Sequence, residues 1–297
     1  MIRTLLRAAV VLSASLALTC QAEPKGKPAP KEKEKAKEAE AKPRAKIPND
    51  LLGDEHVREE FGVNEFTTPS IRRIFDQLDA LGTLSYDNLK KPLDEKPPAD
   101  RVLLSLELGN QIAEGFLVVH CEKIEAMEPV GKALLKYAKA LGAGMKFTKH
   151  SQSLLEYSIK GDWGKLRNEL SATQSDVEAE MVLLRDSDVA HLISLGGWLR
   201  AFEISTQAIA ENYTPEKSRV LGRPDIIEYY IGNLVDLAPE IQKQPLVQDL
   251  REGLEALHPL LDVPAGKAFT EDEVRDLRDK ARLLNEIVRH TEKKEKK

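Results

Sequence analysis

The chain has 297 residues, of which 41% are hydrophobic and 31% charged, and its formal net charge is −5. A chain of this length buries enough apolar surface to fold without covalent cross-links, and its two cysteines exclude a disulfide-rich scaffold. The acidic balance argues against nucleic acid as a partner of the folded body, because negative surface charge repels the phosphate backbone.

Residues 1–22 have the layout of a secretory signal peptide. Arg3 and Arg7 precede an apolar stretch from Ala8 to Thr19, and the sequence then turns polar. This stretch is shorter than the roughly 20 residues that a membrane-spanning helix needs, and we identify no later segment that is long and apolar enough to span. We therefore expect an exported protein, periplasmic or extracellular, with no transmembrane span in the mature chain.

Two processing reactions compete at the end of this leader. Cleavage after Ala22, at a small-x-small site formed with Cys20, would release a soluble chain that begins at Glu23. Lipidation of Cys20 would instead anchor the chain to a membrane. The sequence before Cys20 departs from a bacterial lipoprotein box, because Thr19 stands where Gly, Ala or Ser is usual. We favour the soluble form and keep lipidation at Cys20 as the alternative.

Residues 23–46 consist almost entirely of Lys, Glu, Ala and Pro and contain no side chain able to anchor a core. Such a composition predicts a disordered, charged linker that holds the body away from a membrane, a wall or another module. An arm that binds polyanions is the alternative. Glu residues that interleave the Lys residues disfavour it.

After residue 47 the apolar residues recur every three to four positions, and no period-2 strand pattern is evident. We predict a single all-α domain over 47–290, an irregular multi-helix bundle of about eight to ten helices, followed by a disordered charged tail over 291–297. A helical solenoid is disfavoured because no copy recurs at a fixed period. Helices are expected over about 69–81, 100–126, 129–141, 151–160, 163–184, 187–212, 215–221, 224–238, 246–257 and 271–290.

Local residue types set several of these boundaries. Pro129 disfavours a continuous helix and is placed at a helix start, and His150 is interpreted as part of another helix start beside serines. Asp186 or Ser187 is expected to cap the helix that follows it. Thr270 and Glu273 form the pattern of a capping box.

The usual catalytic and cofactor signatures are missing. The sequence contains no GxxxxGK[ST], GxGxxG, GxSxG, HExxH or paired CxxC motif, so it provides no direct argument for an enzyme, and we predict no cofactor. Cys121 follows a strongly apolar run, which favours an inert buried thiol over a reactive one.

A polar stripe interrupts the apolar helix after Pro98. Glu107, Asn110, Gln111 and Glu114 fall on one helical face. Inward carboxylates can hold metals in helical bundles, but the Glu-x-x-His pattern of such bundles is absent, so no metal site is predicted. The stripe either faces solvent or pairs with basic residues of another helix.

A second candidate lies on the helix expected over 187–212. His191 and Trp198 share one face, and Arg200 and Glu203 share the opposite one. Gly196 and its neighbour Gly197 each cost about 1 kcal/mol relative to Ala in a helix interior. One interpretation is the close approach of a neighbouring helix over the glycines, with the histidine hydrogen-bonded in the core. The other is a ligand pocket over the glycines, with the tryptophan as its wall and the arginine or histidine as its polar contact.

The leading hypothesis is a non-enzymatic, exported binding or scaffold module of the cell envelope or extracellular space. Its partner would be an unidentified protein or envelope component. The rival hypothesis is an envelope enzyme, or a bundle that binds a small ligand or metal, with a pocket near Glu107, Glu114, His191 and Arg200. The candidate ligand-binding residues are Glu107, Glu114, His191, Trp198, Arg200 and Glu203.

Overall fold

The computed structural model describes residues 71–294, except for 79–80, 95 and 184–185. The chain divides into two units, 1–42 and 43–297, and all described residues belong to the second. The predicted signal peptide, the predicted linker over 23–46, the lipidation site at Cys20 and the first part of the predicted domain therefore lie outside the described residues.

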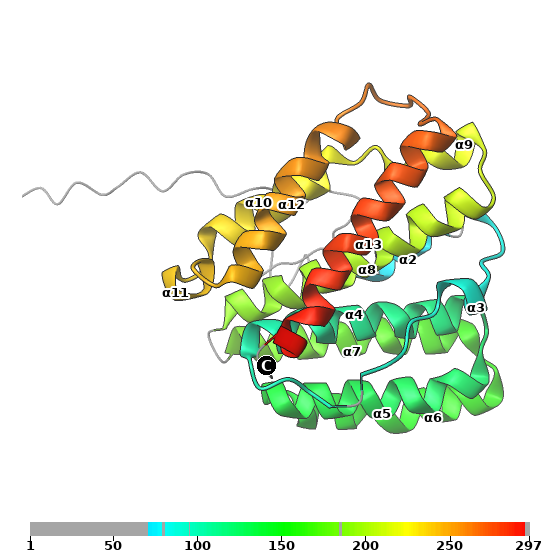
Figure 1. The fold of residues 1–297 in the computed structure, drawn as a ribbon. Helices are drawn as coiled ribbons and strands as arrows, with labels where there is room; N and C mark the ends of the chain where they lie inside the picture. The colour runs from blue at the N-terminus through cyan, green and yellow to red at the C-terminus, as the bar shows by residue number, and fades with distance from the viewer. Residues whose placement is uncertain (1–70, 79–80, 95, 184–185, 295–297) are drawn as a thin grey trace, which may run out of the picture. The chain divides into compact units, whose positions relative to one another are not determined.

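Every described element is a helix, which confirms an all-α bundle for this part of the chain (Figure 1). No strand occurs among the described residues. In chain order the elements are α2 (Ile71–Leu78), α3 (Tyr86–Leu89), α4 (Arg101–His120), α5 (Ile124–Leu141), α6 (Gly144–Lys160), α7 (Trp163–Leu183), α8 (Ser187–Glu211), α9 (Pro215–Ser218), η3 (Arg219–Leu221), α10 (Pro224–Asp236), α11 (Pro239–Gln242), α12 (Pro245–Leu261) and α13 (Glu271–Lys294).

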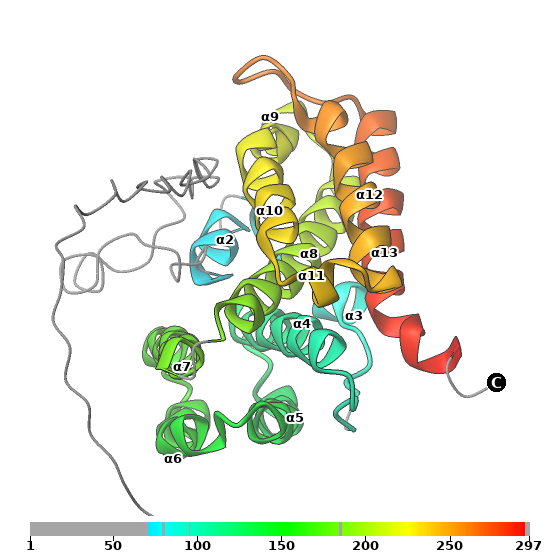
Figure 2. The same ribbon diagram turned by 90° about the vertical axis from the view of Figure 1, so that its left-hand side faces the viewer.

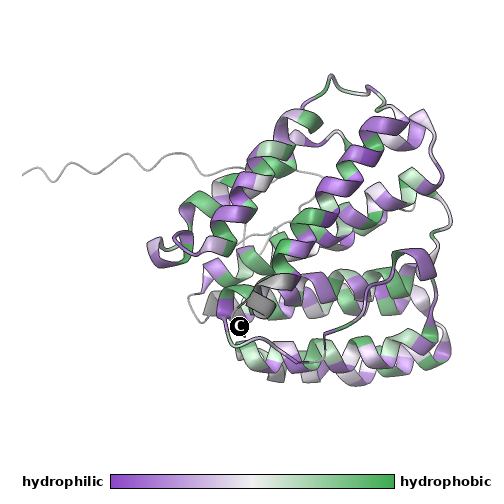
Figure 3. Cartoon of the chain, in the orientation of Figure 1, coloured by the Kyte–Doolittle hydropathy of each residue, from purple (hydrophilic) through white to green (hydrophobic). Residues whose placement is uncertain are grey.

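The bundle is organised around α4 and α8, which lie together at its centre (Figures 1 and 2). Helices α5, α6 and α7 pack in sequence beside α4, and α13 covers α8, with α12 and α10 beyond it. Figure 2 shows α5, α6 and α7 nearly end-on, while α10, α12 and α13 run across that direction. The outer helices carry stripes of hydrophilic and hydrophobic residues, as amphipathic helices on a core should (Figure 3).

Glycines allow the two central helices to touch through their backbones. A Cβ atom added to Gly196 would lie 2.0 Å from the carbonyl oxygen of Leu106, and one added to Gly109 would lie 2.0 Å from that of Ile193. Only glycine fits at both positions. The interpretation of Gly196 and Gly197 as a close helix crossing is therefore confirmed, and the backbone of α4 fills the space where a pocket over the glycines would lie.

Helix α4 is long and apolar enough to cross a membrane, by length and composition alone. The expectation that no segment after the leader reaches that threshold is therefore wrong. However, 94% of its apolar window is buried inside the protein. Packing of α5, α7, α8 and α13 around it accounts for this apolarity, because a helix at the centre of a bundle has little surface left for polar residues.

Three predicted boundaries are wrong: the end of α4 and the starts of α5 and α6. Helix α4 ends at His120, and α5 begins at Ile124 with Pro129 in its second turn. Glu122 makes the break between the two helices, with a left-handed φ of 54°. Because this conformation usually falls on glycine, the sequence does not indicate the break. Helix α6 begins at Gly144 instead of 151. Its N-cap makes no side-chain hydrogen bond, so the sequence contains no capping residue there.

At the other end of the chain, α13 continues to Lys294, so the tail predicted as disordered from 291 is helical for its first four residues. The capping box at the start of α13 is confirmed by both of its hydrogen bonds. The Thr270 amide donates to Glu273 Oε2 at 2.7 Å, and the Glu273 amide donates to Thr270 Oγ1 at 3.3 Å. Asp186 caps α8 by accepting from the amide of Val189.

Candidate functional site

A polar cavity of about 390 Å³ lies between α4, α8, α13 and the segment 89–94, which begins with the last residue of α3. We call it the α4–α8–α13 cavity. The whole polar stripe predicted on α4 borders it, and the stripe is buried instead of facing solvent. The cavity is lined by Lys91, Pro92, Leu93, Asp94, Glu107, Asn110, Gln111, Glu114, Arg200 and Arg289.

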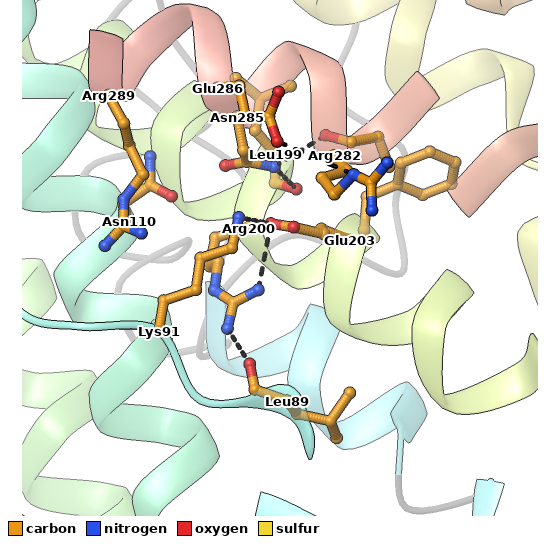
Figure 4. Close-up of polar contacts among 12 residues, drawn as sticks. Leu89, Lys91, Asn110, Leu199, Arg200, Glu203, Arg282, Asn285, Glu286 and Arg289 are labelled. Carbon is orange, nitrogen blue, oxygen red and sulfur yellow. Dashed lines mark hydrogen bonds and ion pairs between the residues drawn. The ribbon is translucent and has the colours of Figure 1, made fainter. Parts of the chain in front are cut away.

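Arg200 of α8 organises the carboxylates around this cavity. Its side chain is almost fully buried and donates from Nε to Glu114 Oε1 at 2.6 Å and from Nη1 to Glu203 Oε2 at 3.0 Å. Nη2 donates to the carbonyl oxygen of Leu89 (Figure 4). Buried carboxylates are tolerated when they are paired and hydrogen-bonded. This confirms the interpretation in which the α4 stripe pairs with a basic residue of another helix.

Lys91 extends the same network. Its ammonium group donates to Glu203 Oε2 at 2.5 Å, so one carboxylate oxygen contacts both Lys91 and Arg200 (Figure 4). Burial lowers the pKa of Lys91, and Arg200 and Arg289 lower it further, whereas Glu203 opposes the shift. Arg200 and Arg289 therefore lie close enough to Lys91 to disfavour its charged form.

No described strand lies beside the segment 89–94, so side chains satisfy its carbonyl oxygens. Three helices supply the donors to its carbonyl oxygens. Leu89 O accepts from Arg200 of α8, Pro92 O from Arg289 of α13, and Asp94 O from Gln111 of α4 at 3.1 Å. The same side chains that line the cavity thus also fix the segment that borders it.

Several polar groups in the cavity keep hydrogen-bonding capacity. Gln111 is 5% exposed, and its Oε1 atom is buried without a hydrogen-bond partner. Asn110 donates from Nδ2 to Leu106 O at 3.3 Å, and its side-chain oxygen accepts from no described residue. Arg289 contacts Pro92 O and forms no ion pair with a described carboxylate. Figure 4 shows Arg289 pointing from α13 toward Asn110.

Glu107 also lines the cavity, and its Oε2 atom accepts a 2.8 Å hydrogen bond from the hydroxyl of Tyr137 on α5. The structure therefore brings together three of the predicted site residues, Glu107, Glu114 and Arg200, with Glu203 joined to them through the arginine. Lys91 and Arg289 were not identified from the sequence. Neither stands in a motif, and both reach the cavity only because of the tertiary fold.

The other two candidates, His191 and Trp198, are not among the residues that line this cavity. His191 Nδ1 lies 3.3 Å from the hydroxyl of Tyr229. Trp198 stacks on Phe202 with ring centroids 5.2 Å apart and borders a separate space of about 40 Å³. Both contacts resemble core packing more than an open ligand pocket.

His150 is not at a helix start, contrary to the prediction, but lies buried inside α6. Its Nδ1 atom is 2.8 Å from Glu169 Oε1, and its Nε2 atom is 3.0 Å from Asp176 Oδ2, both on α7. Burial opposes ionisation of Asp176, but hydrogen bonds from His150 and Lys149 hold the pKa of its carboxyl below the ordinary value. This cluster joins two helices and lies outside the cavity.

Cys121 is partly buried, and its thiol lies 3.7 Å from the carbonyl oxygen of Leu84. Burial raises the pKa of this thiol to about 11, so little thiolate forms near neutral pH. This supports the prediction of an inert thiol. Among the described residues, no group of three or more His, Cys, Asp and Glu side chains is placed to hold a metal ion.

The α4–α8–α13 cavity offers hydrogen-bond donors, acceptors and charges of both signs at fixed positions. Its lining contains no histidine, cysteine or serine. Such a set of groups suits recognition of a polar molecule. No family model matches the chain, and no curated protein or solved structure is detectably similar to it.

Proposed function

We propose that this protein is a non-catalytic binding module that takes a small polar ligand into the α4–α8–α13 cavity. One observation carries the proposal: charged and amide side chains line a cavity that borders the two central helices of an otherwise apolar bundle. Replacing buried ion pairs by apolar residues is often neutral or stabilising. Stability alone therefore gives no reason for this polar lining, whereas recognition of a polar ligand does.

The chemistry of the lining favours binding over turnover. Arg200 already donates to three protein acceptors, and the ammonium group of Lys91 is held against Glu203. Fixed, paired groups of this kind position a ligand. A nucleophile with an adjacent base is the usual arrangement for covalent catalysis, and the residues that line the cavity offer no hydroxyl or thiol for that role.

We place this module outside the cytoplasm as part of the same proposal. It is supported by the leader-like residues 1–22 and by the charged composition of 23–46, which suits a spacer. Its site of action would then be the periplasm, the cell surface or the extracellular space. A partner protein or envelope component would use or supply the ligand.

The test is a thermal-shift screen of the full chain against small polar metabolites, with mass spectrometry of molecules released when the purified protein is denatured. A ligand present at a hundred times its Kd stabilises the folded state by about 2.7 kcal/mol. For a domain of this size that is a rise in Tm of roughly 5 to 10 °C.

The matched variants are Arg289→Met, which alters the cavity, and Arg282→Met, which alters an exposed residue of the same helix. The ligand-induced rise in Tm should be lost in the first variant and kept in the second. The proposal is wrong if no metabolite binds and none is released. It is also wrong if the purified protein turns over a compound that it binds there.

A further inference from the structure

We infer that the ligand is a small zwitterion of the amino-acid type, with its carboxylate on Arg289 and its ammonium group on the side-chain oxygens of α4. This inference rests on the proposed function and specifies the chemistry of the ligand. It follows from the hydrogen-bonding and charge capacity that the described residues around the cavity do not use.

The anionic end of the ligand is assigned from Arg289. Of the three cations that line the cavity, Arg200 pairs with Glu114 and Glu203, and Lys91 pairs with Glu203. Arg289 forms no ion pair with a described residue and donates only to the carbonyl oxygen of Pro92. A guanidinium group has five N–H donors in a planar fork that matches a carboxylate. Arg289, which has no counter-ion among the described residues, thus has the geometry to bind a carboxylate.

The cationic end is assigned from two neighbouring amides on α4. Nε2 of Gln111 is fixed by Asp94 O, which leaves Oε1 buried and without a partner. Nδ2 of Asn110 is similarly fixed by Leu106 O. The two amide oxygens are acceptors, and an ammonium group carries three donors. Because an unsatisfied buried acceptor is unfavourable, a ligand that donates here removes a defect of the free protein.

The charge balance excludes a bare anion as the best ligand. Three cations and three carboxylates line the cavity: Lys91, Arg200 and Arg289 against Asp94, Glu107 and Glu114. Glu203, which contacts two of the cations, adds a fourth carboxylate. A ligand with only negative charge would meet this excess, whereas an ammonium group on the same ligand offsets it.

The size of the cavity points the same way. At about 390 Å³ it lies near the lower end of the 300 to 1,000 Å³ that is usual for ligand pockets. A single amino acid with its solvation is of this scale, while a long peptide or a nucleotide cofactor needs a larger site. The ligand is therefore a free small molecule.

The experiment is isothermal titration calorimetry of the full chain with the twenty free amino acids, each added separately. For the amino acid that binds most tightly, two derivatives follow: its amide, which lacks the carboxylate, and its N-acetyl form, which lacks the ammonium group. Both derivatives should bind at least tenfold more weakly than the parent. If either binds as tightly as the parent, the zwitterion assignment is wrong.

The variants assign each end of the ligand. Arg289→Met should weaken binding of the amino acid at least tenfold but leave the weak binding of the amide unchanged. Gln111→Leu should weaken binding of the amino acid but not of the N-acetyl derivative. Arg282→Met, at an exposed position of α13 outside the cavity lining, should match the parent chain. Because the derivative series uses the parent chain, the assignment stays testable even if a variant fails to fold.

Inorganic phosphate separates failure of this inference from failure of the proposed function. If phosphate, or another metabolite from the thermal-shift screen, binds in a manner that depends on Arg289 while no amino acid binds, the inference is overturned and the binding function stands. If neither amino acids, phosphate nor the screened metabolites bind, both are overturned.

Discussion

Replacement of Arg200 by methionine should be among the most destabilising single changes in the protein. Methionine keeps much of the length and apolar volume of the side chain but removes its charge and all of its donors. Arg200 is 2% exposed and bonds to Glu114, Glu203 and the Leu89 carbonyl. After the change Glu203 keeps its 2.5 Å contact with Lys91, so Glu114 is the carboxylate most affected.

The magnitude follows from the burial of the pair. Removal of one partner from a buried ion pair costs about 3 to 5 kcal/mol, because the remaining charge is left in a poorly polarisable environment. In urea denaturation this corresponds to a fall in the midpoint of roughly 1 to 2 M, for a slope of about 3 kcal/mol per M. A matched surface change, Arg275→Met, removes exposed ion pairs with Glu271 and Asp272 and should cost at most about 1 kcal/mol.

A double-mutant cycle separates the ion pair from the loss of side-chain packing. Arg200→Met combined with Glu114→Met removes both charges, so the double variant should be less destabilised than the sum of the two single variants by about 2 kcal/mol. Two results would refute the reasoning. The first is a fall in urea midpoint for Arg200→Met that is no larger than the fall for Arg275→Met. The second is full additivity of the destabilisation caused by Arg200→Met and Glu114→Met. Either would mean that water or neighbouring groups already satisfy Glu114.

Three further outcomes test other parts of the structure. Gly196→Ala should destabilise the protein by about 3 kcal/mol in urea denaturation, because its Cβ would lie 2.0 Å from Leu106 O. Gly131→Ala, in α5, where an added Cβ would meet no neighbouring atom within 4 Å, should be neutral or stabilise the protein by up to about 1 kcal/mol. The lowered pKa of Asp176 contributes stability that is present above its ordinary value of 3.8 and is lost as the pH falls through the folded pKa. Below about pH 4 the urea midpoint of Asp176→Asn should therefore fall less steeply with pH than that of the parent chain. Parallel curves of urea midpoint against pH would contradict this. Burial raises the pKa of the Cys121 thiol to about 11, so in a Cys20→Ser background this thiol should react with a disulfide reagent at pH 8 far more slowly in the folded chain than in urea. Equal rates would show that the thiol is accessible in the folded chain.

Helix boundaries could be predicted from the sequence wherever a nearby side chain caps the helix. Asp186 caps α8 and Thr270 opens α13 because short polar side chains bond to free amides within the same turn. The break at Glu122 and the start of α6 at Gly144 could not be predicted. A non-glycine residue holds the left-handed conformation in the first case, and no side chain caps the helix in the second.

The candidate site could be predicted only in part, for a related reason. The stripe on α4 and the charged face around Arg200 are visible as helical spacing, and a buried carboxylate requires a buried cation nearby. Arg289 and Lys91 are ordinary basic residues in their local sequence. They join the site because α13 and the segment 89–94 converge on α4, which depends on packing between elements far apart in the chain.

The glycine crossing and the charged cavity are parts of one arrangement. Gly196 lies one helical turn before Arg200, and Gly109 immediately precedes Asn110 on α4. Backbone contact at the glycines brings the two helices close enough for Arg200 to reach Glu114 at 2.6 Å. A side chain at either glycine would push the helices apart and lengthen that ion pair. The glycines, each costing about 1 kcal/mol of helix stability, therefore hold Arg200 and Glu114 at ion-pair distance beside the cavity.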